Sequence, residues 1–312
     1  MLDYLKRLLG LAGTTAPIAA AAGDRRASGD DTGSDRVPVG SWVYQLQDVE
    51  PSRIAACDVD LAVVDYSADG TGDEAFSPAD VAMMKKSPGG RAKKVIAYMS
   101  IGEAESYRFY WNKAWKKKDL RPAWLDRENP DWHENFKVRY WDPAWQSILF
   151  GTPQSYLDLI IAAGFDGAYL DIVDAFEYYE RSRPSAAGDM VAFVGKLADY
   201  ARAKKPGFLI IPQNGESLLQ RPEYRKTISA IAKEDLYFGL DDDEHHNAAG
   251  EVRECLDYLA LAKANGIPVM VVEYLESEPK IATARRDLAA LGYAGYFGPR
   301  DLDAIGTTTR LA

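Results

Sequence analysis

The stretch from Gly164 to Ala175, Gly-Phe-Asp-Gly-Ala-Tyr-Leu-Asp-Ile-Val-Asp-Ala, constrains the fold of this chain more than any other. It opens with a glycine that can end a helix, runs through a short apolar segment at 168–170 and finishes on Asp171. A run this short and rich in β-forming residues predicts a buried strand. Side chains at the carboxyl ends of parallel strands point into the sites of barrels and open sheets, so Asp171 and Asp174 are candidate functional carboxylates. The alternative is that Asp171 caps the following helix.

Eight short apolar segments alternate with helical patterns along the chain, at 42–47, 61–66, 94–100, 167–171, 208–213, 228–233, 268–273 and 293–297. Such alternation predicts an α/β fold with parallel strands, and a (β/α)8 TIM barrel needs about 250 residues. We therefore predict a single (β/α)8 barrel over residues 38–312, with an open doubly wound sheet as the alternative. The first strand is not followed by a glycine-rich phosphate loop, which excludes the usual nucleotide sites.

Two of the helical patterns are explicit. Ser77-Pro78-Ala79-Asp80 places an N-cap serine, a first-turn proline and an acid at the start of one helix. Another helix carries an apolar face with the 3.6-residue period, made of Met190, Phe193, Val194, Leu197 and Ala201.

Polar side chains follow nearly every predicted strand, and together they predict a ring of hydrogen-bonding groups suited to sugar hydroxyls. The alternative for each acid other than Asp171 and Glu234 is a helix cap or a salt bridge on the barrel rim. The candidate substrate-binding residues at or near these strand ends are Tyr44, Gln45, Asp65, Tyr66, Tyr98, Ser100, Glu103, Asp174, Asn214, Glu216, Glu273 and Tyr296.

The connection between the third and fourth predicted strands is unusually long, with residues 104–143 preceding the next helix. Five of the seven tryptophans lie there, so we predict an aromatic-rich insertion after strand three. A loop of this length is usually functional. Aromatic faces pack on sugar rings, so the segment is expected to wall a glycan cleft, with Tyr107 and Trp141 as candidate contacts. The alternative is a satellite core under the insertion.

The charge of the chain, −10 at pH 7, repels phosphate backbones and argues against nucleic acid as a partner. A neutral or cationic polymer is compatible with it. Residues 1–22 resemble a secretory signal with a small-residue cleavage site, which predicts export, and residues 23–37 read as a flexible linker. A plain disordered tail is the alternative. The segment is too short and too polar to span a membrane stably.

The remaining candidate chemistry is sparse. Asp241-Asp242-Asp243-Glu244-His245-His246 matches no usual metal spacing and predicts a solvated acidic loop, so no metal or cofactor is expected. Cys255 lies on an apolar helical face, which favours a small buried hydrophobic side chain, and a disulfide with Cys57 is the alternative if the protein is exported. We expect a monomer.

Five segments together resemble one family, the endo-α-1,4-polygalactosaminidases (glycoside hydrolase family 114-like), which also groups barrel proteins of unknown function. The match covers roughly residues 40–300. The segments are Trp42-Val43-Tyr44-Gln45-Leu46-Gln47, the nine residues from Ala97 to Glu105, Asn129-Pro130-Asp131-Trp132, the stretch ending at Ala175, and Pro212-Gln213-Asn214-Gly215-Glu216.

The resemblance implies an endo-acting hydrolase of an α-1,4-linked galactosamine-containing polysaccharide. It also implies that Asp171 is the nucleophile or base and Glu234 the general acid, because glycosidic hydrolysis needs two carboxyl groups. Glu234 follows an apolar run, and a partly desolvated rim would favour its proton. The alternatives are a glycan-binding barrel without turnover and a hydrolase of another α-glycosidic linkage.

Overall fold

The computed structural model describes residues 36–311 of the 312-residue chain. The predicted signal-like segment, 1–22, and all but the end of the predicted linker lie outside the described residues, so both stay predictions. No helix within residues 36–311 is long and apolar enough to cross a bilayer. In the same range Cys57 and Cys255 are both free thiols, the first half-buried and the second buried.

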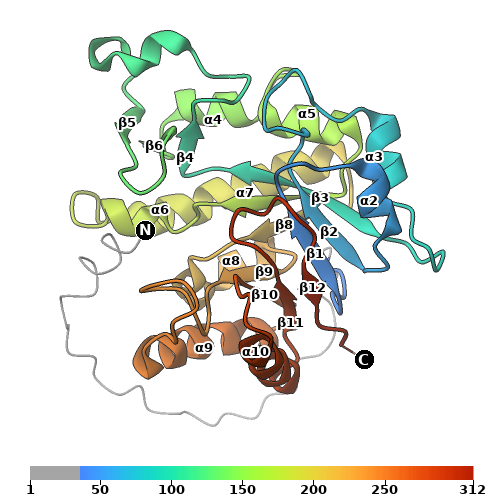
Figure 1. The fold of residues 1–312 in the computed structure, drawn as a ribbon. Helices are drawn as coiled ribbons and strands as arrows, with labels where there is room; N and C mark the ends of the chain where they lie inside the picture. Colours follow the sequence, from blue (N-terminus) through green and yellow to red (C-terminus); the bar gives the residue numbers. More distant parts are fainter. Residues whose placement is uncertain (1–35, 312) are drawn as a thin grey trace, which may run out of the picture.

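Each of the eight predicted strands is present within residues 36–311, and the strands form two sheets of parallel neighbours (Figure 1). The first sheet has the order β1 (Trp42–Gln45), β2 (Leu61–Val64), β3 (Lys94–Ser100), β7 (Gly167–Asp171) and β8 (Leu209–Pro212). The second has β9 (Ile231–Glu234), β10 (Val269–Glu273) and β11 (Ala294–Phe297), with the antiparallel strand β12 (Thr307–Thr308) at its edge.

Two seams join the sheets. At the first, Gln213 and Ala232 form an isolated parallel bridge between the ends of β8 and β9. At the second, the indole N–H of Trp42 on β1 donates to the carbonyl of Ala294 on β11 at 2.9 Å. These contacts give a TIM-barrel-like arrangement, but the strand ladder is interrupted at both seams. Closure into a single (β/α)8 barrel therefore stays a prediction.

Aromatic rings fill the space between the two sheets. Trp42 packs on Tyr44 and Tyr296 with ring centroids 5.9 and 5.4 Å apart, and Tyr44 packs on Tyr169 at 5.2 Å. All four side chains are fully buried. Each ring comes from a strand, so the packing of large aromatics holds the sheets together where backbone hydrogen bonds do not.

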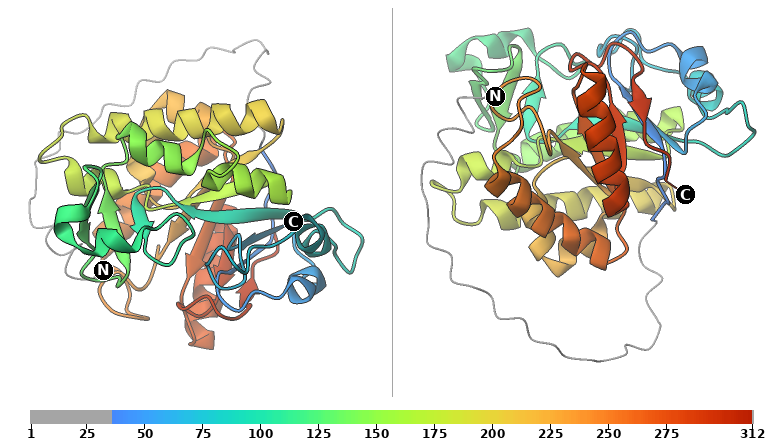
Figure 2. Two further views of the ribbon diagram at one scale, coloured as in Figure 1. Left: turned by 90° about the horizontal axis from the view of Figure 1, so that it is seen from above. Right: turned by 60° about the horizontal axis from the view of Figure 1, so that its bottom comes forward.

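The helices lie outside the strands (Figures 1 and 2). They are α2 (Pro51–Ala56), α3 (Pro78–Met84), α4 (Pro143–Leu149), α5 (Tyr156–Ala163), α6 (Ala175–Tyr179), α7 (Ala186–Lys204), α8 (Pro222–Thr227), α9 (Ala249–Ala264) and α10 (Glu278–Leu291). Short 3-10 helices cover Lys113–Lys116, Lys118–Leu120 and Glu216–Gln220.

The start and stop signals read from the sequence are confirmed. Ser77 caps α3 in a capping box with Asp80, and Gly164 ends α5 in a left-handed conformation with φ 95°. The predicted apolar face of α7 is buried.

The segment after β3 is folded. It holds a small antiparallel sheet with the order β4 (Glu103–Glu105), β6 (Asn135–Val138) and β5 (Leu125–Glu128). Three of its tryptophans stack in series, Trp111 on Trp115 and Trp115 on Trp124, and Trp124 continues onto Trp145 of α4 at 5.0 Å. These rings form the satellite core that the sequence left as an alternative, because they cover one another rather than a cleft.

Candidate active site

A pocket of about 570 Å³ opens beside the carboxyl ends of the strands. This volume lies within the range of small-molecule sites. The pocket brings together ten of the candidate residues named from the sequence: Tyr44, Asp65, Tyr98, Glu103, Tyr107, Asp171, Asp174, Asn214, Glu216 and Glu234. They come from both sheets, so the site spans the seam between β8 and β9.

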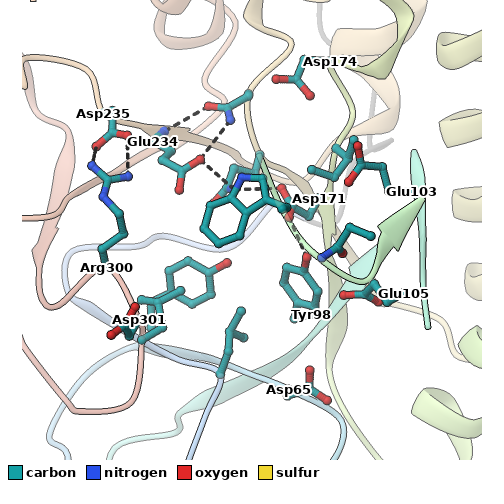
Figure 3. Close-up of a pocket in the computed structure, with 18 of the residues that line it drawn as sticks. Asp65, Tyr98, Glu103, Glu105, Asp171, Asp174, Glu234, Asp235, Arg300 and Asp301 are labelled. Carbon is teal, nitrogen blue, oxygen red and sulfur yellow. Dashed lines mark hydrogen bonds and ion pairs between the residues drawn. The ribbon is translucent and has the colours of Figure 1, made fainter. Parts of the chain in front are cut away.

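Asp171 ends β7, and its backbone is fixed by pairing with Ser100 on β3. Its carboxylate accepts hydrogen bonds from the Tyr98 hydroxyl at 2.6 Å and from the Gln213 amide at 2.8 Å (Figure 3). Burial and then the charge of Glu234 raise the pKa of Asp171 to about 7. The next helix begins only at Ala175, so the alternative that Asp171 caps it is wrong.

Glu234 ends β9 and faces Asp171 across the seam. Its carboxylate accepts a hydrogen bond from the Tyr274 hydroxyl at 2.7 Å and longer ones from the amides of Asn214 at 3.4 Å and Gln213 at 3.5 Å. The same Gln213 nitrogen therefore contacts both carboxylates. Its two distances bound the separation of the contacted oxygens to roughly 6 Å.

The chain turns in the same way after three of these strand ends. Ile172, Asn214 and Asp235 follow Asp171, Gln213 and Glu234, and all three have positive φ, at 55°, 59° and 54°. A left-handed residue reverses the backbone within one step, which leaves the preceding side chain at the pocket floor. For β-branched Ile172 this conformation costs about 1–3 kcal/mol, so the packing around it must hold it in place.

Gly102 shows how tight that packing is. A Cβ atom at this position would lie 2.1 Å from the carbonyl oxygen of Ile172. Only glycine lets the turn after β3 approach the turn after β7 this closely.

The pocket wall is strongly acidic. Each of its three cations is already paired with a carboxylate: Arg108 with Asp65 at 2.8 Å, Lys233 with Glu216 at 3.7 Å, and Arg300 with Asp235 at 3.0 Å. The eleven lining acids are Asp65, Asp69, Glu103, Glu105, Asp171, Asp174, Glu177, Glu216, Glu234, Asp235 and Asp301. The excess of carboxylates favours a neutral or cationic ligand over an anionic one.

Asp174 and Glu177 extend the acidic wall beyond the two strand-end carboxylates. Burial is the main cause that raises the pKa of Asp174 to about 6 and that of Glu177 to about 8. Burial also raises the pKa of nearby Glu216, but the charge of Lys233 outweighs it and leaves this pKa below its ordinary value. Within this wall, Asp174 and Glu177 thus change their charge near neutral pH, whereas Glu216 is ionised there.

Three of the candidates from the first sheet and its insertion do not reach the pocket. The Gln45 amide donates to the backbone carbonyls of residues 47, 48 and 303, and so ties the chain after β1 to the C-terminal loop. Ser100 donates to the Glu103 carbonyl. Trp141 packs edge-on against Tyr179 and under the Arg183 guanidinium. Backbone partners and ring contacts occupy these side chains instead of a ligand.

Three further candidates also lie outside the pocket lining. The Tyr66 ring packs edge-on against Tyr156 at 4.9 Å. Glu273 accepts hydrogen bonds from the backbone N–H groups of residues 237 and 238, so it organises the loop after β9. Tyr296 belongs to the interior stack and accepts from the Gly306 N–H. A residue at a strand end lies near the carboxyl edge of the sheet, but its side chain need not point into the pocket.

The predicted acidic loop at 241–246 is tied to its surroundings. Arg300 binds Asp243 at 2.8 Å, and Glu244 accepts from the backbone of Ser277 at 2.7 Å. Within residues 36–311 there is no group of three or more His, Cys, Asp or Glu side chains arranged to hold a metal ion.

The model of glycoside-hydrolase family GH114 matches residues 25–311. The chain belongs to glycoside-hydrolase family GH114. It is 41% identical over 246 residues to an uncharacterized protein of Methanocaldococcus jannaschii, covering 77% of this chain and 67% of that one. It is 39% identical over 268 residues to an uncharacterized protein of Deinococcus radiodurans, covering 85% and 82%.

The GH114 chain also resembles a solved structure, the glycoside hydrolase domain of PelA from Pseudomonas aeruginosa. The TM-score is 0.68 at 19% identity, over 86% of this chain and 98% of that one. At this identity the likeness speaks for the fold alone, and it agrees with a TIM-barrel-like arrangement. Membership of GH114 supports glycosidase activity, and with it a carbohydrate substrate.

Sequence reasoning about this GH114 chain did not single out several groups that line the pocket. Gln213 and Tyr274 follow predicted strands and were not among the candidates, although they donate to the two central carboxylates. Arg108 lies in the aromatic insertion and was not a candidate either, yet it is buried between Asp65 and Glu105. The spacing of Glu105 and Arg108, three residues apart, was the signal that could have marked this ion pair.

Proposed function

We propose that the protein is an endo-acting glycosidase that cleaves an α-1,4-linked, galactosamine-containing polysaccharide, with Asp171 and Glu234 as its catalytic carboxyl groups. The observation that carries this proposal is the Gln213 amide, which contacts both carboxylates across the seam. Binding a sugar does not require two acids to be held at this spacing, whereas cleaving a glycosidic bond does.

The spacing further favours retention of anomeric configuration. Retaining glycosidases hold their carboxyl groups about 5–5.5 Å apart, and inverting ones about 6.5–9.5 Å apart to admit a water. The upper limit of roughly 6 Å that Gln213 sets for the contacted oxygens lies below the inverting range and admits the retaining spacing.

In this mechanism an Asp171 oxygen attacks the anomeric carbon while Glu234 gives its proton to the leaving glycosidic oxygen. The C–O bond to the leaving sugar breaks and a glycosyl ester of Asp171 forms. Glu234, now ionised, then takes a proton from water, and the resulting attack releases the sugar and restores both carboxyl groups.

The charge of the pocket supports an amino sugar as substrate. A galactosamine unit with a free amine is cationic, and the three lining cations are already paired with acids. Burial raises the pKa of Asp171 to about 7, and a nearby ammonium group lowers it again, because an opposite charge favours the ionised form. Substrate binding would thus help to ionise the nucleophile.

This assignment differs in one respect from the argument made for Glu234 on the sequence. That argument placed desolvation at Glu234, whereas the raised pKa described above is that of Asp171. The role of Glu234 as proton donor therefore rests on its place opposite Asp171 and on the family resemblance.

The experiment that tests the proposal is incubation with a panel of α- and β-linked amino-sugar polymers, with products sized by mass spectrometry. Cleavage of an α-1,4-galactosamine polymer into a ladder of oligomers supports it, and N-acetylating the polymer should reduce kcat/KM. Cleavage of only another α-linked polymer would mean that the protein is a glycosidase with a different substrate from the one proposed. Binding of a polymer without cleavage would contradict the proposed hydrolysis and support the alternative of a glycan-binding barrel without turnover. We further propose that the protein is exported and acts as a monomer on such a polymer.

A further inference from the structure

Trp132 differs from the other tryptophans of this chain. All seven lie within the described residues, and the other six each pack their ring against another aromatic ring: Trp42, Trp111, Trp115, Trp124, Trp141 and Trp145. Trp132 has no such ring partner within residues 36–311, and it is 44% exposed. Because this exposed ring lines the acidic pocket, its face is available to pack on a ligand bound there.

The position of Trp132 is the second observation. Among the described residues, the large hydrophobic side chains that are exposed are Met83, Tyr107, Phe109, Leu120 and Trp132. Only Tyr107 and Trp132 of these line the acidic pocket. The Tyr107 hydroxyl is already bound to Glu105, which leaves Trp132 as the exposed indole at the pocket wall.

The turn that carries Trp132 is held in place. It connects β5 to β6, and the Asn129 amide donates to a Glu103 oxygen at 3.0 Å. Lys137 on β6 binds the same Glu103 oxygen at 3.2 Å. Glu103 therefore anchors the turn to the wall of the pocket, so the indole is presented by a supported hairpin.

The anchor also places the turn along the pocket. Figure 3 shows Glu103 and Glu105 beyond Asp171, on the side away from Glu234, while Asp235 and Arg300 lie on the Glu234 side. Trp132 and Glu103 thus line the same pocket as Asp171 and Glu234.

We propose that Trp132 is a stacking platform for a sugar ring of the bound chain, on the acidic wall of the pocket. This inference rests on the proposed function for the identity of the sugar. The galactose configuration gathers C–H groups on one face of the ring, which packs on an indole. The ammonium of a galactosamine unit is attracted both to the indole face and to the acids beside it.

The test compares binding and turnover in matched variants. Glu234→Gln provides an inactive background, in which binding of galactosamine oligomers of two and six units is measured by titration calorimetry. Adding Trp132→Ala should weaken binding of the hexamer about tenfold, whereas Trp132→Phe should retain most of the affinity. Leu120→Ala, an exposed apolar residue of the same insertion that lies outside the pocket lining, is the matched control and should change the affinity for neither oligomer.

The outcomes separate this inference from the function on which it rests. Equal affinity for the hexamer with and without Trp132 would overturn the platform, even if the wild-type enzyme cleaves the polymer. Oligomer binding that requires Trp132, in a protein that cleaves no galactosamine polymer, would support the platform and refute the proposed cleavage. Failure of the Glu234→Gln protein to bind either oligomer would overturn the platform as stated, while cleavage by the wild type would still be judged on its own.

Discussion

The two central carboxylates of the pocket, Asp171 and Glu234, each accept a hydrogen bond from a tyrosine hydroxyl, but the charged side chains around them differ. Asp171, on the five-stranded sheet, accepts from Tyr98 at 2.6 Å, and Glu234, on the other sheet, accepts from Tyr274 at 2.7 Å. Next to Glu234 stand two cations, Lys233 and Arg300. The leading charges that act on Asp171 are instead the anions Glu234 and Asp174.

Asp171 and Glu234 are both carboxylic acids at strand ends, but the fold gives them different charged neighbours. A tyrosine hydroxyl fixes the direction of each carboxylate, while burial and then the neighbouring anions raise the pKa of Asp171. The proton on Asp171 is therefore sensitive to what enters the pocket, and the seam bridged by Gln213 couples the two sides.

The largest effect on kcat is expected when either Asp171 or Glu234 loses its carboxyl group. Asp171→Asn and Glu234→Gln should each reduce kcat by about 10³-fold or more, with the double variant little worse, because groups that act as a unit are not additive. Kinetics on the polymer identified by the panel measure this. Additive losses in the double variant would mean that the two sides act independently.

The melting temperature of Asp171→Asn provides the control. The folded pKa of Asp171 is about 7, above the unfolded value of about 3.9, so its contribution to stability is lost as pH rises through about 7. The asparagine of the variant cannot ionise, so the melting temperature of the variant relative to that of the wild type should be higher at pH 8 than at pH 4. A lower melting temperature at pH 8 would contradict the burial of this charge.

A smaller effect is expected from breaking the bridge between the two sides. Gln213→Leu removes the amide that contacts both carboxylates, and losing hydrogen bonds to charged groups costs about 1.5–3 kcal/mol, which predicts a fall in kcat of about 10–100-fold. Tyr169→Phe is the matched variant, since it removes only the hydroxyl that donates to Gln213 at 2.6 Å. It should lose less, and unchanged kcat in Gln213→Leu would remove the bridge from the mechanism.

The smallest effect should distinguish the two tyrosine donors. The Tyr98 hydrogen bond lowers the pKa of Asp171, so Tyr98→Phe should raise this pKa further. The acid limb of the kcat/KM profile would then move to higher pH, with a larger loss at pH 6 than at pH 8. Tyr274→Phe, on the other side, should leave that limb in place. The same shift in both variants would mean that the limb does not report Asp171.

The strands, and the place of Asp171 and Glu234 at the pocket, could be predicted from the sequence because both follow from local patterns. Short apolar runs predict strands, and the acid that ends a buried run is conspicuous at 171. The sequence predicted side-chain direction poorly. Glu273 and Gln45 also end strands, but backbone partners that are distant in sequence turn them away from the pocket. Likewise the aromatic insertion was recognised, but which of its tryptophans remains exposed depends on tertiary stacking that no local pattern encodes.

The central claim is that Asp171 and Glu234 form one catalytic pair at retaining distance across the seam. The most direct measurement is proton NMR of the anomeric signal in the first product released from an α-linked substrate, recorded before mutarotation. The account predicts that the α-anomer appears first, because attack by Asp171 and then by water inverts the centre twice. First appearance of the β-anomer would contradict it, since a single displacement by water needs carboxyl groups about 6.5–9.5 Å apart, beyond the limit of roughly 6 Å that Gln213 sets for the contacted oxygens.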